Sequence, residues 1–182
     1  MCRAAPSWAK ARFKAAVEAL YRGVLPIGPV GGGTYYYGPP VPFDDLAFAL
    51  AGAGPITGFV VRAGAVVDAV TAYFGGGLGP RHGGDGGQPY DVRFAAGDLL
   101  QQLTGFVGTR WGSVYIVQLS FVTRSGARYG PYGPSSAGPG DTPFDLSAGA
   151  GHQIIALYGQ TVLAQRYNAP PSDFVNQLGA YT

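Results

Sequence analysis

The sequence predicts an all-β domain built from related units that are repeated about an axis. Short apolar runs alternate with 31 glycines and 15 prolines, which is the pattern of strands separated by tight turns. Beyond residue 25, helix signals are nearly absent. Residues 64–73 return as residues 172–181, with matching residue types at more than half of the positions. Such repetition indicates one supersecondary unit used several times.

The repeat extends upstream of both copies and has a third member. Residues 56–60 are echoed by residues 154–158, and a third echo lies at residues 103–107, so the copies are spaced by roughly 50 residues. The front halves are 98 residues apart (56 to 154), whereas the back halves are 108 apart (64 to 172). We therefore expect an insertion at residues 159–171 that splits the last repeat.

The first 25 residues differ from the rest of the chain. Residues 7–22 predict one amphipathic helix, which Ser7 can cap and Gly23 can end. Such a helix can bind a membrane surface or a partner. The favoured alternative is a terminal extension docked on the domain, or the tail of a missing neighbour. The expected division is a helical extension at 1–25 and one β domain at 26–182.

Charge argues against a nucleic-acid partner. The net charge of +2 arises because residues 1–25 hold five basic residues and one acidic residue, which leaves seven basic and nine acidic residues in the remainder. A nearly neutral body lacks the clustered positive charge that phosphate binding needs. A chain of 182 residues is long enough for one well-buried domain.

Other chemistry is limited by composition. One cysteine, Cys2, excludes an internal disulfide and a cysteine-based zinc site, and two distant histidines, His82 and His152, argue against a histidine metal cluster. We expect no cofactor and no metal. No apolar stretch is long enough for a membrane-spanning helix, and no secretion signal is visible. Either the chain is intracellular or its natural start is missing.

The glycine tract at residues 28–33 precedes three consecutive tyrosines, Tyr35, Tyr36 and Tyr37. Bare glycine backbone and aromatic faces suit the rim of a binding site, but an ordinary hairpin explains them equally well. No Lys-Ser/Thr pair follows, so this is not a phosphate loop. Later strands are expected near residues 46–50, 56–62, 89–95, 98–107, 114–123, 127–130, 143–147, 152–158 and 174–181.

Several motifs, in order, resemble the jacalin-related lectins over roughly residues 27–182. They lie at residues 28–32, 43–45, 64–73, 82–87, 103–108, 129–133, 142–144 and 174–181. The resemblance implies a β-prism of three four-stranded antiparallel Greek-key sheets with pseudo-threefold symmetry. It also implies sugar sites, each formed by a glycine-rich loop and a Gly-x-x-x-Asp loop. One ionised carboxylate there can accept hydrogen bonds from two neighbouring hydroxyls.

The primary site of such lectins corresponds to what we call the Asn176 site. It places Gly31 and Gly32 opposite the segment Ser172, Asp173, Phe174, Val175 and Asn176. Asn176 stands where the family has aspartate, so the site loses a charge. Because charge-assisted hydrogen bonds are about twice as strong as neutral ones, we expect this site to be weakened, altered or inactive.

The second site, which we call the Asp68 site, keeps the full pattern and is preferred. It combines Gly64, Ala65, Val66, Val67 and Asp68 with the loop that holds Gly83 and Gly84. We expect Asp68 to accept two hydroxyls and the amides of Val66, Val67, Gly83 and Gly84 to donate. Alternatively, Asp68 caps its own turn and the glycines only form a hairpin.

Two neighbouring residues and the remaining repeat are expected to bind no sugar. His82 and Asp85 are interpreted as residues that order their loop. The remaining repeat has Ile116 where an acid would be needed, so no site is expected there.

The resemblance favours a mannose/glucose-type ligand, because galactose-binding members use a glycine N-terminus made by chain cleavage. Weak single sites would gain strength through a homo-oligomer or a larger parent chain. The alternatives are a protein-interaction or structural module with degenerate sites, and a glycosidase with paired carboxylates. We disfavour an enzyme because no nucleophile–base constellation stands out. The candidate carboxylates would be Asp44, Asp45, Asp68, Asp85 and Asp173.

Overall fold

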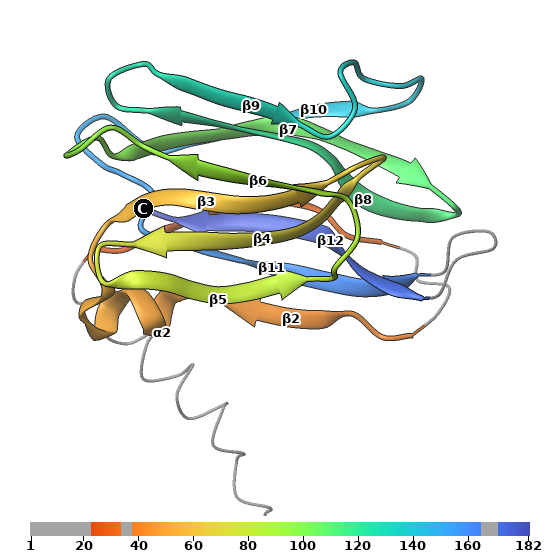
Figure 1. The fold of residues 1–182 in the computed structure, drawn as a ribbon, viewed down its shortest axis with the longest axis horizontal. Coiled ribbons are helices and arrows are strands. Elements are labelled where there is room, and N and C mark those ends of the chain that lie inside the picture. Colours follow the sequence, from red (N-terminus) through yellow and green to blue (C-terminus); the bar gives the residue numbers. More distant parts are fainter. Residues whose placement is uncertain (1–22, 34–37, 165–170) are drawn as a thin grey trace, which may run out of the picture.

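The computed structural model describes residues 23–33, 38–164 and 171–182, and β-strands dominate this part of the chain (Figure 1). The helix expected at residues 7–22 and the three tyrosines at 35–37 lie outside the described residues.

The strands form three four-stranded antiparallel sheets, which confirms the expected β-prism. The first unit has the order β5-β4-β3-β6 (Gly77–Gly83, Val67–Phe74, Ile56–Ala63, Gln88–Arg93). The second unit has the order β10-β7-β8-β9 (Thr142–Ser147, Leu100–Arg110, Ser113–Thr123, Arg128–Tyr132). The third unit has the order β1-β12-β11-β2 (Pro26–Gly31, Ser172–Tyr181, Ala156–Ala164, Val41–Asp44).

The three units share one Greek-key arrangement. A central hairpin (β3–β4, β7–β8 or β11–β12) is flanked by two outer strands that are consecutive in the chain. In the third unit these outer strands, β1 and β2, come from the start of the chain, so the two ends of the chain close one sheet. Leu25 and Thr182 exchange backbone hydrogen bonds of 2.9 Å, which fixes this closure.

Each central hairpin contains a β-bulge, and the three bulges give the structural alignment of the units. The residues displaced from pairing are Asp68 in β4, Val117 in β8 and Asn176 in β12. The residue that corresponds to Asp68 in the second unit is therefore Val117, and the expected Ile116 was wrong by one position. Both are apolar, so the expectation that this unit lacks an acid is unchanged.

The same alignment corrects the third echo. Counting back from the bulges, Ile56 corresponds to Leu100 and Ile154, whereas the echo at residues 103–107 begins with Leu103, which corresponds to Phe59. The sequence match was three residues out of register because both strands carry similar apolar runs.

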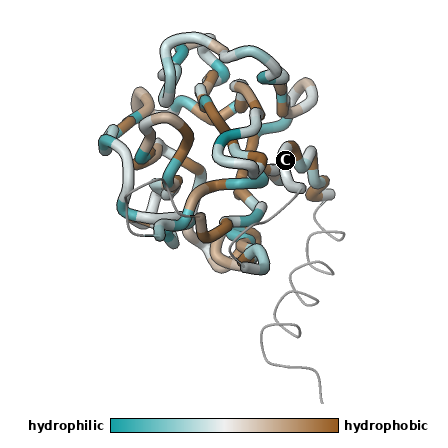
Figure 2. Tube along the Cα trace, turned by 90° about the vertical axis from the view of Figure 1, so that its right-hand side faces the viewer, coloured by the Kyte–Doolittle hydropathy of each residue, from teal (hydrophilic) through white to brown (hydrophobic). Residues whose placement is uncertain are grey.

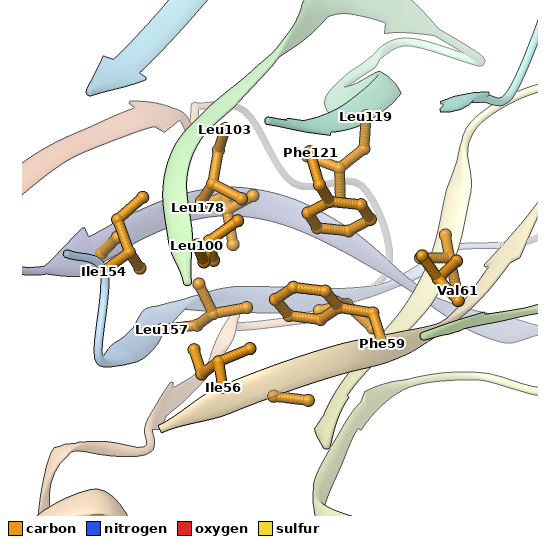
Figure 3. Close-up of a cluster of buried hydrophobic side chains, with 14 of the residues drawn as sticks. Ile56, Phe59, Val61, Leu100, Leu103, Leu119, Phe121, Ile154, Leu157 and Leu178 are labelled. Atoms are coloured by element: carbon orange, nitrogen blue, oxygen red, sulfur yellow. The ribbon is translucent and has the colours of Figure 1, made fainter. Parts of the chain in front are cut away.

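The core is formed where the inner faces of the three sheets meet. Ile56, Leu100 and Ile154 form one layer, and the stacked rings of Phe59 and Phe121 lie 4.1 Å apart beside it (Figure 3). Burial of each such side chain stabilises the fold by about 1.5–3 kcal/mol. Seen from the side in Figure 2, hydrophobic segments run through the interior while many outer loops are hydrophilic.

One local expectation was wrong and one strand was missed. The segment expected as a strand at 46–50 forms a short helix, α2 (Leu46–Phe48), followed by a π-helical turn, η1 (Ala49–Ala53). The Leu46 amide donates to Asp44 Oδ1 at 2.9 Å, which starts this turn where the strand ends. Strand β5 was missed because the glycine tract before it has the composition of a turn. The last repeat does contain extra residues, since Ile154 and Asn176 lie ten positions further apart than Ile56 and Asp68, and part of the expected insertion at 159–171 lengthens the hairpin, with β11 continuing to Ala164 and pairing there with Ser172.

Candidate functional site

At one end of the prism, at the right in Figure 1, each glycine loop lies against the β-bulge of its own unit. Gly31, Gly83 and Gly133 all have positive φ angles, of 81°, 111° and 118°. A Cβ atom at any of the three would overlap the carbonyl oxygen of the bulge residue. Only glycine permits this approach, so all three units retain it.

The next residue in each loop separates two units from the third. The Gly32 amide donates to the Asn176 carbonyl at 2.9 Å, and the Gly84 amide donates to the Asp68 carbonyl at 3.0 Å. The corresponding residue of the second unit is Pro134, which has no amide hydrogen. The Pro134 carbonyl instead accepts a hydrogen bond from Gln118 Nε2 at 2.5 Å.

In the second unit an ion pair joins the end of β7 to the residue that precedes β10. Both terminal nitrogens of Arg110 donate to the carboxylate of Asp141, at 2.8 and 2.7 Å, and the Asp141 side chain is fully buried. The Gly138 amide adds a hydrogen bond of 2.7 Å. Hydrogen bonding from Arg110 holds the pKa of Asp141 below its ordinary value. With Val117 at the bulge, the side chain there offers no hydrogen-bond acceptor.

The Asn176 site contains a buried side-chain amide whose nitrogen has a hydrogen-bond partner and whose oxygen has none among the described residues. Asn176 is fully buried, and its Nδ2 donates to the Val114 carbonyl at 2.6 Å. This bond fixes the orientation of the amide, and Asn176 Oδ1 has no hydrogen-bond partner among the described residues. Ser172 and Asp173 are partly exposed beside it, whereas Phe174 and Val175 are buried.

Trp111 is a further residue of this site that the sequence interpretation missed. It lies in the β7–β8 turn with φ of +48°, is 41% exposed, and its ring centroid lies 5.9 Å from that of Phe174. Two-residue hairpin turns with positive φ favour Asn-Gly, so Trp111-Gly112 is a costly choice. That mismatch was visible in the sequence and is the signal that could have identified Trp111.

The Asp68 site is closed in this structure. Asp68 is fully buried, and a Cβ atom at Gly87 would lie 2.6 Å from its Oδ2, so the loop at residues 84–87 covers the carboxylate with its last residue, Gly87. Arg62 holds that loop by donating to three backbone carbonyls, at 2.5 Å (Asp85), 2.8 Å (Gly86) and 3.0 Å (Gly87). An ion pair between Arg81 and Asp85, 2.7 Å long, lies on its outer side.

The expected donors of the Asp68 site are brought together, but not as free donors. The Gly84 amide donates to two carbonyls, that of Asp68 at 3.0 Å and that of Asp173 at 3.1 Å, so the expectation that it faces a ligand is wrong for this conformation. Val66 and Val67 are buried, and Gly64 and Ala65 are exposed at the turn.

His82 has a structural partner outside its loop. His82 Nε2 lies 2.8 Å from Oδ1 of Asp45, which is almost completely buried, and its ring stacks on Phe43 with centroids 4.0 Å apart. The pair joins the first unit to the third. Asp85 pairs with Arg81, in keeping with the loop-ordering role expected for it.

The aspartates are thus largely engaged in structural contacts. Asp44 accepts hydrogen bonds from the Leu46 amide and from Tyr181, and Asp45 binds His82. Within residues 23–33, 38–164 and 171–182, no group of three potential metal ligands comes together. The same part of the chain contains no helix long and apolar enough to cross a membrane.

Comparisons with known proteins point to one family. The model of the jacalin-like lectin domain matches residues 75–181. The fold resembles wild-type Malaysian banana lectin, at 24% identity and a TM-score of 0.64, covering 87% of this chain and 97% of that one. It also resembles artocarpin in complex with mannopentose, at 19% identity and a TM-score of 0.65, covering 87% and 97%.

A third similar structure is a mannose-specific jacalin-related lectin from Morus nigra in complex with mannose. Its identity is 21% and its TM-score 0.62, covering 87% of this chain and 93% of that one. At these identities the structural likeness concerns the fold alone. No match is found among curated protein sequences.

Proposed function

Because the chain belongs to the family of jacalin-like lectin domains, with more than half of its length matched, we propose that it is a non-catalytic lectin module. Family membership supports carbohydrate binding. The proposed ligands are mannose/glucose-type sugars, bound at the Asp68 site and the Asn176 site. Solved structures of similar fold include lectins in complex with mannose and with mannopentose, which motivates this choice.

The observation that carries the proposal is the contrast among the three bulges. Val117 shows that the fold is compatible with an apolar side chain at this position, yet Asp68 and Asn176 place polar groups there in full burial. Burying a polar group costs free energy unless it is fully hydrogen-bonded. The two polar bulges are also the two that face a Gly-Gly loop, whereas Val117 faces Gly133-Pro134. A polar bulge side chain and a Gly-Gly loop therefore occur in the same two units, and a site that binds hydroxyls requires both.

Each acceptor suits sugar hydroxyls in its own way. A carboxylate has two acceptor oxygens, so the Asp68 side chain is of the type that can bind two neighbouring hydroxyls through charge-assisted bonds. Asn176 offers only Oδ1, because Nδ2 is engaged by Val114. Trp111 adds an exposed aromatic face beside the Asn176 site, on which the apolar face of a sugar ring can pack.

Access to Asp68 requires movement of its cover. The loop at residues 84–87 lies over the carboxylate, so a sugar reaches Asp68 only when this loop lifts. The energy of lifting reduces the apparent affinity of the site. We therefore expect weak single-site binding that gains strength from several copies, as in a homo-oligomer.

A degenerate module that binds no sugar is the second candidate. The complete burial of Asp68 and Asn176 favours it. The two functions differ in whether the protein responds to free monosaccharide.

Titration calorimetry with methyl α-mannoside separates them, with methyl β-galactoside as the stereochemical control. The proposal expects millimolar binding of the mannoside, weakened about fivefold or more by Asp68→Asn, because a charged acceptor becomes neutral. The matched control is Asp91→Asn, an exposed aspartate on β6. Absence of heat with every sugar, or equal binding by wild type and Asp68→Asn, contradicts the assignment. Turnover of nitrophenyl mannosides would contradict the non-catalytic part.

A further inference from the structure

We propose that Gly84 couples the two sites, as a positioning residue of the Asn176 site that belongs to the loop of the Asp68 site. Sugar binding at Asp68 then weakens binding at the Asn176 site, and the reverse. This inference rests on the proposed function, but part of its test needs no sugar.

One amide is shared between the two sites. The Gly84 amide donates to the carbonyl of Asp68 at 3.0 Å and to the carbonyl of Asp173 at 3.1 Å, as a three-centre hydrogen bond. Asp68 is the bulge residue of the first unit, and Asp173 belongs to the binding segment of the third unit. The contact therefore joins the two candidate sites directly, through backbone atoms alone.

The contact with the third unit requires the residue to be glycine. A Cβ atom at Gly84 would lie 2.5 Å from Ser172 Oγ, 2.6 Å from the Asp173 carbonyl oxygen and 3.0 Å from the Asp173 nitrogen. The φ angle of Gly84 is outside the left-handed region, so its own backbone conformation does not explain the glycine. Close packing of this loop against Ser172 and Asp173 does explain it.

Opening of the Asp68 site disturbs this contact. The cover over Asp68 consists of the residues that directly follow Gly84, held at Asp85, Gly86 and Gly87 by Arg62. A cover that lifts from Asp68 pulls on Gly84 and breaks or lengthens its bond to Asp173. The segment at 172–173 then loses the partner that holds it beside Asn176.

Sugar binding at one site should weaken sugar binding at the other. The closed cover stabilises the Asn176 site, and the open cover is needed at Asp68, so each sugar favours a different loop position. Thermodynamic linkage makes the effect reciprocal, and couplings of this kind commonly change affinity about 5- to 150-fold. Two copies of a sugar therefore bind with negative cooperativity.

Two variants test the coupling by NMR on ¹⁵N-labelled protein titrated with methyl α-mannoside. Arg62→Ala releases the cover without adding atoms near Asp173. We expect tighter binding reported by the amides of Val67 and Ala69, and about fivefold weaker binding reported by Phe174 and Val175. Gly84→Ala should shift both affinities in these same directions. Gly149→Ala is the matched control, because the nearest atom to its added Cβ is His152 Cδ2 at 3.8 Å.

A sugar-free readout separates this inference from the proposed function. In Arg62→Ala alone, the amide resonances of Asp173 and Phe174 should shift and the Gly84 amide should exchange faster. Unchanged resonances and exchange overturn the coupling, even if sugar binds. Affinities that change in the same direction at both sites also overturn it. If no sugar binds to wild type, the proposed function fails, while the sugar-free comparison still decides whether Gly84 links the two loops. If Gly84→Ala does not fold, Arg62→Ala decides the question.

Discussion

Asn176 donates a hydrogen bond from Nδ2 to the backbone carbonyl of Val114, 2.6 Å away in the neighbouring sheet. The amide of Asn176 therefore connects the third unit to the second, at the position where an aspartate would be expected from the family pattern. An aspartate at this position would lack the hydrogen that makes the bond. The substitution in this chain is thus a change in how the units are joined, and not only the loss of a charge.

Asn176→Asp should accordingly destabilise the fold, and it should not restore a stronger sugar site. A carboxylate oxygen would face the Val114 carbonyl in a fully buried position, and we expect a loss of about 2–3 kcal/mol in the free energy of unfolding. Urea unfolding at pH 7 measures it. Asp68→Asn, the reverse change in the first unit, serves for comparison. An Asn176→Asp protein as stable as wild type, with tighter mannoside binding, would show that this assignment is incorrect.

Because of the ion pair between Arg110 and Asp141, the free energy of unfolding should decrease at acid pH. Because its folded pKa is lowered, Asp141 contributes stability that is present above its unfolded pKa of about 3.9 and is lost as pH falls through the lower folded pKa. Asp141→Asn should remove about 3 kcal/mol at pH 7, and much less once the pH has fallen below the lowered pKa of folded Asp141. Thermal unfolding from pH 2 to 7 is the measurement. The exposed pair between Arg93 and Asp91 is the control, since Asp91→Asn should cost no more than about 1 kcal/mol.

His82→Ala should be strongly destabilising although the residue borders a proposed sugar loop. Removal of the imidazole leaves the Asp45 carboxylate buried without its partner, which costs about 3 kcal/mol. The double variant Asp45→Asn/His82→Ala should recover at least about 1 kcal/mol, because no charge is then buried alone. A double-mutant cycle in urea gives the coupling. If the two single losses simply add, the pair makes no specific contribution.

Replacement of Trp111 should increase the stability of the fold and weaken sugar binding. Trp111→Asn places a residue that tolerates positive φ into the β7–β8 turn and should stabilise the fold by about 0.5–1 kcal/mol. The same change removes the exposed ring and should weaken mannoside binding at the Asn176 site. Thermal unfolding and calorimetry on one preparation test both halves. Lower stability with unchanged affinity would identify Trp111 as a packing residue only.

Much of the fold was predictable because its pattern is local and repeated. The copies at residues 64–73 and 172–181 correctly paired Asp68 with Asn176, and short apolar runs between glycines located most strands of the central hairpins. The third unit remained harder, because β1 and β2 are separated from their partners by most of the chain. The register of the second unit was misjudged by three residues, because β3 and β7 carry similar apolar runs that can be aligned in more than one way.

The candidate sites were only partly predictable. Sequence motifs identified the glycine loops and the two polar bulge residues, Asp68 and Asn176, because those need particular residue types. They did not reveal that Arg62 holds the loop over Asp68, or that the Gly84 amide is shared with Asp173, because both depend on contacts between distant segments. The hydrogen bond from Asn176 to Val114 joins two sheets, so it likewise cannot be predicted from the sequence of a single strand.

The most direct test of two sugar-binding units is a titration of the ¹⁵N-labelled chain with methyl α-mannoside, read at the three bulges. We predict saturable shifts at Val67 and Ala69 and at Phe174 and Val175, with no response at Val117 or Gly133. The absence of shifts at all three bulges, or a shift at Val117 equal to those at the other two, would contradict the proposal of two sugar-binding units.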